Sequence, residues 1–177
     1  MMRTRAVLSL ATAALVTCAF TGLAHAASDT ISAIIPWQGQ GQIFPVGAKK
    51  LRFLGSLEGI MYVETAKGEL NEAFVSCPIV QDLDASDGST SASGSCLIVA
   101  SPEDSVFAEI TCSGERGLCS GEIKLTSGTG RFAGISGSGK MTVRSPVHAL
   151  AADLSEGTVV QIAAGILQIP KLTYKLP

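Results

Sequence analysis

Apolar and polar residues alternate with a period of two along much of this chain, and that period limits the folds open to it. Successive side chains of a β-strand point to opposite faces, whereas an α-helix repeats every 3.6 residues. The chain is therefore predicted to be all-β, with roughly eight strands and little helix. The alternation is clearest at 59–65, 73–77, 96–100, 106–112 and 119–126, and further strands are predicted at 42–57 with a break near Gly47, at 139–145 and at 157–174.

Clusters of glycine, proline and short polar residues separate these segments and mark hairpin turns. Strands joined by such short turns are antiparallel neighbours. An antiparallel sheet of this size either closes on itself or leaves edges that invite aggregation. We therefore expect a closed antiparallel barrel with hairpin (meander) connections, in which glycines relieve the bends. The turns are predicted at 67–68, 87–88, 101–104, 114–117 and 128–130.

The N-terminus has the composition of an export signal. Two arginines precede an apolar run over 6–20, and Ala-His-Ala at 24–26 forms a small-x-small cleavage site. Residues 1–26 are therefore predicted to be a cleaved signal peptide, and 27–177 a single domain that works in the periplasm or outside the cell. A lipid anchor on Cys18 is the alternative fate of this segment.

The charge of the predicted mature chain argues against a nucleic-acid partner. Residues 27–177 carry 11 Lys and Arg against 15 Asp and Glu, a formal charge of −4. Proteins that bind nucleic acids usually carry a clustered basic face. The longest basic run here is Lys49-Lys50 with Arg52 nearby, which is typical of a solvated strand end.

Four cysteines remain once the signal is removed, and an even number in an oxidising compartment favours two disulfides. Three pairings are possible in principle. A predicted turn lies between Cys77 and Cys96, and another lies between Cys112 and Cys119. We therefore expect the pairs Cys77–Cys96 and Cys112–Cys119, each clipping its own hairpin. A metal site of four thiolates is the alternative, but no C-x-x-C pair occurs, and no metal or other cofactor is predicted.

The two faces of the predicted strands differ in polarity. In 106–112 and 119–126 one face carries apolar residues and cysteines, and the other carries charged and hydroxyl groups, as in a sheet that is wet on one side. The segment 157–169 is instead apolar on both sides. An interface between subunits of a dimer or trimer explains this pattern, and coverage by a terminal segment explains it equally well.

A membrane-spanning barrel is a further alternative. Such barrels need an apolar outer band between aromatic girdles. Residues 27–177 contain only one Trp, two Tyr and five Phe, and the middle strands carry charges on their outer faces. The apolar run at 157–169 is also too short to cross a bilayer as a helix. A chain that does not span a membrane is therefore expected.

Two features resemble catalytic motifs and lack a required residue. The run 134–141 has P-loop spacing, but Met141 stands where the Mg²⁺-binding Ser or Thr belongs. His148 is the one histidine of 27–177, and no G-x-S-x-G elbow accompanies it. The sequence therefore leans away from an enzyme that uses a nucleophile.

The interior of the barrel is the remaining place for a function. An eight-stranded barrel is filled by side chains or holds one small ligand. Tyr62 and Glu64 share parity on a strand with two partly apolar faces, so they are the candidate catalytic groups, and Tyr62 and Phe107 are the candidate ligand-binding aromatics. A carboxylate in an apolar cavity has a raised pKa and acts as an acid or base. In the alternative interpretation, Glu64 points to water near the 66–68 turn.

The run Gly128-Thr129-Gly130-Arg131-Phe132-Ala133-Gly134 resembles the G-T-G-[RK]-F-x-G turn of the allene oxide cyclase and dirigent β-barrel superfamily, which includes secreted bacterial members. The likeness is strong over 128–139 and weaker from 42 to 174. It implies a β-barrel. It also implies that Phe132 plugs one end of the barrel and that Arg131 satisfies carbonyl groups at the corner. The residues given a structural role are Gly128, Gly130, Arg131, Phe132 and Gly134.

The same resemblance frames the expected function. The plant members of this superfamily look like proteins that work through the lumen of the barrel. Allene oxide cyclases isomerise a fatty-acid epoxide, and dirigent proteins steer the coupling of phenolic radicals, typically as trimers. We expect a small apolar ligand, lipid-like or isoprenoid, bound in the lumen, because candidate catalytic groups are few. An isomerase or cyclase acting in the barrel is one alternative. A structural or interaction protein with a filled barrel is the other.

Overall fold

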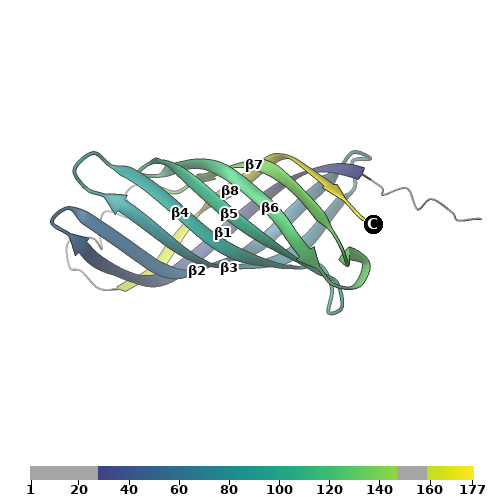
Figure 1. Ribbon diagram of the computed structural model, residues 1–177, viewed down its shortest axis with the longest axis horizontal. Helices are drawn as coiled ribbons and strands as arrows, with labels where there is room; N and C mark the ends of the chain where they lie inside the picture. The colour runs from purple at the N-terminus through teal and green to yellow at the C-terminus, as the bar shows by residue number, and fades with distance from the viewer. Residues whose placement is uncertain (1–27, 147–158) are drawn as a thin grey trace, which may run out of the picture.

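The computed structural model describes residues 28–146 and 159–177. The predicted export signal, His148 and the first residues of the predicted 157–169 segment lie outside these ranges. The described residues form eight antiparallel strands and one 3-10 turn (Figure 1). The elements are β1 (Ser28–Gly47), β2 (Lys50–Thr65), β3 (Leu70–Asp84), β4 (Ser89–Val99), β5 (Ser105–Glu115), β6 (Leu118–Gly128), η1 (Gly130–Phe132), β7 (Ser136–Arg144) and β8 (Val159–Lys175).

The sheet closes into a barrel. Each strand pairs with the next along the chain, and β8 returns to pair with β1. In Figure 1 the strands wind obliquely around a long axis, and the C-terminus leaves from the same end at which β1 begins. The predicted all-β barrel with hairpin connections is confirmed.

One predicted boundary is wrong. The sequence pattern left 28–41 unassigned and treated 59–65 as separate from 42–57, whereas β1 begins at Ser28 and β2 runs unbroken from Lys50 to Thr65. The break predicted near Gly47 coincides with the turn at 48–49 between them. Pro36, Gly39 and Gly41 lower the strand propensity of the segment 28–41. Pairing with β2 on one side and β8 on the other holds it in the sheet.

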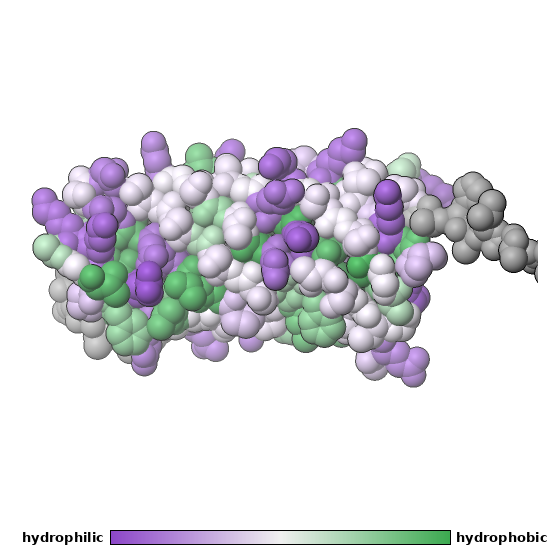
Figure 2. Space-filling model, in the orientation of Figure 1, coloured by the Kyte–Doolittle hydropathy of each residue, from purple (hydrophilic) through white to green (hydrophobic). Residues whose placement is uncertain are grey.

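Side chains alternate between the lumen and the outer surface. In β1, Ala33, Ile35 and Trp37 are buried, whereas Ile34 and Pro36 between them are exposed. Figure 2 shows hydrophilic side chains over much of the visible outer surface, with hydrophobic side chains gathered between them toward the lower left. The core is therefore a column of apolar side chains along the barrel axis.

The 3-10 turn η1 lies at one end of the barrel, which we call the Phe132 end (Figure 1). The φ angles of Gly130 and Gly134 are 55° and 78°, in the left-handed region that glycine adopts without steric cost. The turn they form directs Phe132 and Ile135 toward the barrel, where both pack against the core. The glycine-rich turn therefore covers this end of the lumen.

Among the described residues, the side chain of Arg131 contacts the carboxylate of Asp104. Its Nε lies 3.4 Å from Asp104 Oδ2, and its guanidinium lies 4.9 Å from the Phe132 ring centroid. The backbone N–H of Arg131 donates to Asp104 Oδ1 at 2.9 Å, and Ser101 Oγ donates to Asp104 Oδ2 at 3.0 Å. These hydrogen bonds, that from Arg131 first, hold the pKa of Asp104 below its usual value. A side chain from the neighbouring β4–β5 turn thus anchors the corner.

Both predicted disulfides are present. Cys77 joins Cys96 between β3 and β4 with a Cα–Cα distance of 4.1 Å, and Cys112 joins Cys119 between β5 and β6 with a Cα–Cα distance of 5.6 Å. Each bridge staples one hairpin and lies on the lumen side of the wall, as the burial of Cys77, Cys96 and Cys119 shows. Two bridges are consistent with an oxidising, exported location.

Candidate functional site

Trp37 divides the lumen into two parts. Toward the Phe132 end the interior is packed, apart from a void of about 20 Å³ beside the Cys77–Cys96 bridge. Toward the opposite end, which carries the β1–β2, β3–β4 and β5–β6 turns and which we call the Arg116 end, lies a cavity of about 100 Å³. Four apolar side chains line both spaces and form the floor of the cavity: Trp37, Leu57, Ile110 and Leu167.

The indole of Trp37 lies against Gly165 on the neighbouring strand β8. Trp37 is paired with Gly59 on β2 and Gly165 on β8. A Cβ at Gly165 would lie 2.5 Å from Cζ2 and 2.8 Å from Cε2 of the indole, too close for any side chain. The ring therefore lies against the barrel wall, and it is 8% exposed.

Phe53 on β2 is held against the wall in the same way. A Cβ at Gly41 would lie 2.6 Å from both Cε2 and Cζ of its ring, and a Cβ at Gly55 would also collide with it. Aromatic rings laid over glycines support a strand that lacks side chains at those points. Because both large rings lie against the wall, the space between Trp37 and the Arg116 end stays open.

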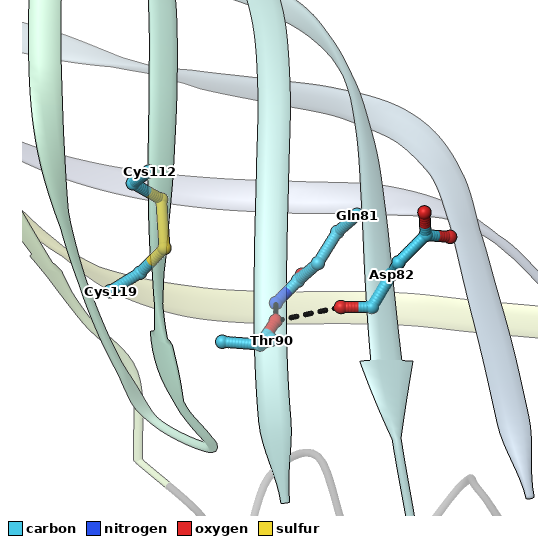
Figure 3. The surroundings of a disulfide bond; sticks show 5 residues. All are labelled: Gln81, Asp82, Thr90, Cys112 and Cys119. Carbon is cyan, nitrogen blue, oxygen red and sulfur yellow. Dashed lines mark hydrogen bonds between the residues drawn. A yellow bond between two sulfur atoms is a disulfide. The ribbon is translucent and has the colours of Figure 1, made fainter.

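A pair of polar side chains interrupts the apolar lining. Thr90 is 6% exposed and is the buried polar residue among those the structure describes. Its Oγ1 donates to the Asp82 carbonyl at 3.0 Å and accepts from Gln81 Nε2 at 2.9 Å (Figure 3). Figure 3 also shows the Cys112–Cys119 bridge on the neighbouring strands. The Thr90 hydroxyl is therefore satisfied by Gln81 and by the backbone, and the pair adds stability more than reactivity.

The carboxylate of Asp82 lies on the outer face. It accepts from Arg52 Nε at 2.7 Å and from Arg52 Nη2 at 2.9 Å. These hydrogen bonds lower the pKa of Asp82 and raise that of Arg52. The pair is exposed, so it belongs to the surface and takes no part in the cavity.

The mouth of the cavity is built from the β5–β6 turn. Glu115, Arg116 and Gly117 contribute to the lining. The backbone N–H of Arg116 donates to the Gly88 carbonyl at 2.8 Å, which ties this turn to the β3–β4 turn. The Nε of Arg116 is buried and has no hydrogen-bond partner among the described residues. Arg116 therefore places a cation at the entrance to a space whose lining is mainly apolar.

The residues that the sequence predicted for the lumen lie elsewhere. Tyr62 is 41% exposed and Phe107 42% exposed, and Glu64 is exposed as well. All three are on the outer face. On β2 the inward positions are taken by Met61 and Val63, which pack in or against the core, so the parity chosen for 59–65 was wrong. A reaction or binding site built on Tyr62, Glu64 or Phe107 inside the barrel is therefore excluded.

The outer face carries a row of exposed apolar side chains. Ile166 on β8 pairs with Pro36 on β1, and Ile60 on β2 pairs with Phe74 on β3. Ile166 is 46% exposed, so the part of the predicted 157–169 segment that the structure describes does present an apolar outer face. The other members of the row are Ile34, Tyr62, Leu97 and Phe107.

No protein-family model matches this chain, and no curated protein matches it. Within residues 28–146 and 159–177, no helix has the length and hydrophobicity needed to cross a membrane. In the same ranges, no three His, Cys, Asp or Glu side chains are grouped so as to hold a metal ion.

Sequence reasoning missed the side chains that line the cavity. Trp37 continues the period-two series Ile31, Ala33, Ile35, and that series was readable once the strand was extended back to Ser28. Phe53 lies in a segment that was predicted to be a strand. The two glycines that lie against its ring, Gly41 and Gly55, belong to different strands, so the sequence of one strand does not reveal them. The cavity therefore depends on cross-strand register, which a single strand's pattern does not contain.

Proposed function

We propose that this protein, in the periplasm or outside the cell, binds a small and mainly apolar molecule in the cavity between Trp37 and the Arg116 end. The observation that carries the proposal is the contrast within one lumen: one half is packed like an ordinary core, while the other keeps an apolar space that reaches the turns. Protein interiors are close-packed, so an apolar space of this kind needs a reason.

The size of the space restricts the ligand. An apolar cavity of about 150 Å³ is known to bind benzene, and drug-sized ligands occupy about 300–1,000 Å³. The enclosed volume here is about 100 Å³. It therefore suits a small ring or the end of a short chain. A lipid-like or isoprenoid molecule would place one end between Trp37 and Leu57 and leave the rest in the mouth.

The likeness of the 128–134 turn to the allene oxide cyclase and dirigent superfamily supports the same proposal, because those relatives are expected to work through the lumen. An isomerase or cyclase would need an acid or base inside the barrel. Among the described residues of the lining, Glu115 is the one carboxylate, and it is exposed at the mouth. Binding without chemistry is the better fit to such a lining.

Trp37 offers a direct test because it is the single tryptophan of the chain. The mature protein is titrated with methylenecyclohexane, a hydrocarbon that would place its methylene end in the cavity and the rest of its ring in the mouth, while tryptophan emission is followed. We expect a saturable change in emission, with calorimetry giving one site per barrel. Free N-acetyltryptophanamide is the control for a solvent effect. A linear response equal to that of the control, with no heat of binding, would refute the proposal.

We also propose that the apolar row on the outer face is a contact between copies of this chain. Seven large side chains, each about 40% exposed, present on the order of 600 Å² of apolar surface, the upper end of what a monomer usually exposes. Sedimentation velocity tests this. Phe74→Lys, in the row, should lower the sedimentation coefficient, whereas Thr111→Lys, on the polar part of the wall, should not. A wild-type chain that sediments as a monomer at high concentration would contradict the proposal.

A further inference from the structure

Gln81 brings a side-chain amide into the lining of the cavity. Among the described residues of that lining, it is the one that carries an amide. It continues the inward series of β3, in which Ile79 is buried, and its own side chain is half-buried. Because Gln81 faces inward from a closed wall, the surface that it keeps accessible is reached from the lumen.

The amide has hydrogen-bonding capacity to spare. A carboxamide carries two N–H donors and an accepting oxygen. Within residues 28–146 and 159–177 it makes one hydrogen bond, in which Nε2 donates to Thr90 Oγ1 at 2.9 Å. Its Oε1 is nevertheless absent from the buried atoms without a partner in these ranges, which are Nε1 of Trp37 and Nε of Arg116. The Gln81 oxygen is therefore accessible, whereas those two nitrogens are enclosed by protein.

Thr90 fixes the direction in which the amide is held. The Thr90 hydroxyl donates its single proton to the Asp82 carbonyl at 3.0 Å, so its Oγ1 can only accept from Gln81. Figure 3 shows the Gln81 and Thr90 side chains pointing toward one another from β3 and β4. The nitrogen of the amide is thus turned to Thr90, which leaves the oxygen and the second N–H for another partner.

The neighbours of Gln81 leave room for that partner. The strand register places Phe53 on one side of Gln81 and Ala92 on the other, and all three line the cavity. The Phe53 ring lies against glycines of the wall, and Ala92 contributes a single methyl group. Gln81 lies one inward position beyond Ile79, about 7 Å along β3 toward the Arg116 end. The amide therefore borders the open space above the floor.

We propose that the ligand is a small aliphatic alcohol, that its apolar end lies on the floor at Trp37, and that its hydroxyl binds the Gln81 amide. This inference rests on the proposed function. A hydroxyl donates to Oε1 and accepts from the second N–H of Nε2, so it matches both groups that Thr90 leaves over. A ketone or ether has no proton to give to Oε1, and an ionised group in this mainly apolar lining would be costly to bury. Gln81 is thus the residue that sets specificity.

A matched pair of probes isolates the contact with Gln81. 3-Methylbutan-1-ol and 2-methylpentane share one branched skeleton and differ by a hydroxyl in place of a methyl group. Their dissociation constants are measured through tryptophan emission on the wild type and on Gln81→Met, which keeps an unbranched side chain of similar length. Because the transfer of each probe out of water is common to both proteins, it cancels when the two alcohol-to-hydrocarbon ratios are compared. We expect this ratio to be about fivefold less favourable to the alcohol in Gln81→Met.

The control is Gln40→Met, the same substitution at an exposed position on the outer face of β1. It should leave the ratio unchanged. A second measurement uses the wild type alone, so it does not depend on the folding of a variant. The side-chain NH2 resonances of Gln81, assigned through bonds from its backbone amide, should shift with 3-methylbutan-1-ol and stay nearly in place with 2-methylpentane.

The outcomes separate the two proposals. If neither probe binds the wild type, the proposed function fails. If both probes bind but the ratio is the same in Gln81→Met, or the Gln81 NH2 resonances respond equally to both probes, binding in the cavity stands and the alcohol is refuted.

Discussion

Filling the cavity with protein atoms should raise stability and abolish binding at the same time. Ala92 lies on β4, faces the lumen and lines the cavity. Ala92→Leu adds three carbon atoms at that point. These atoms would occupy part of the cavity that the probe ligand needs. The enclosed volume is about 100 Å³, so little would remain for a ligand above Trp37.

The expected change in stability follows from the apolar groups that the new leucine side chain removes from water. Three methylene-sized groups moved out of water contribute about 2.4 kcal/mol, and fixing a leucine side chain costs about 0.5–1 kcal/mol. The free energy of unfolding should therefore increase by about 1.5 kcal/mol. For a domain of this size that corresponds to a rise in Tm of about 3–6 °C. Binding of methylenecyclohexane should be lost.

Urea denaturation followed by circular dichroism measures the first effect, and calorimetry measures the second. Ser91→Leu is the matched control, since Ser91 is exposed on the outer face of the same strand and its replacement should change stability by less than about 0.5 kcal/mol. A destabilised Ala92→Leu would show that the lumen is already full at this level. That outcome would refute the cavity, and with it the reasoning that placed a ligand there.

Three other substitutions test the wall and the corner. Thr90→Val removes both hydrogen bonds of its hydroxyl and should lower the free energy of unfolding by about 1–2 kcal/mol in urea, and a neutral result would mean that the buried pair is not formed. Joint replacement of Cys77 and Cys96 by alanine opens a bridge between residues 19 apart in sequence and should cost about 3 kcal/mol by urea denaturation. A loss below about 1 kcal/mol would contradict the chain-entropy account. The pKa of Asp104 is lower in the folded than in the unfolded state, so its carboxylate stabilises the fold at neutral pH. That stabilisation is lost as the pH falls through the pKa of the folded state. Asp104→Asn should therefore lose less stability than wild type between about pH 5 and 2, and identical acid slopes would show that this carboxylate does not matter.

The sequence was sufficient for the parts of this fold that are local. The turn residues at 67–68, 87–88 and 101–104 each fall between two strands, because glycine, proline and aspartate fix turns through their own backbone preferences. Both disulfide pairings followed from predicted turns, at 87–88 and at 114–117, since each bridge closes one hairpin. Closure of the sheet followed from the need to avoid free edges.

The candidate site could not be predicted, for a physical reason that β2 illustrates. Ile60 and Tyr62 on one face are nearly as hydrophobic as Met61 and Val63 on the other, and the outer face of this strand belongs to the exposed apolar row. Alternation between two apolar faces does not tell which one is buried. The choice is made by the fit of Met61 into the core, which depends on strands distant in sequence.

The seam between β1 and β8 has a consequence for how the molecule comes together. Ser28 pairs with Lys175, so the backbone hydrogen bonds of this seam form only when two segments far apart in the sequence meet. Until then the sheet has two edge strands whose backbone N–H and C=O groups are unpaired. The β3–β4 and β5–β6 hairpins, each closed by a disulfide, reach their native register through contacts that are local in sequence. They can therefore fix the middle strands of the sheet before β1 and β8 pair. The two disulfides therefore restrict the chain before the barrel closes as well as stabilising the closed barrel.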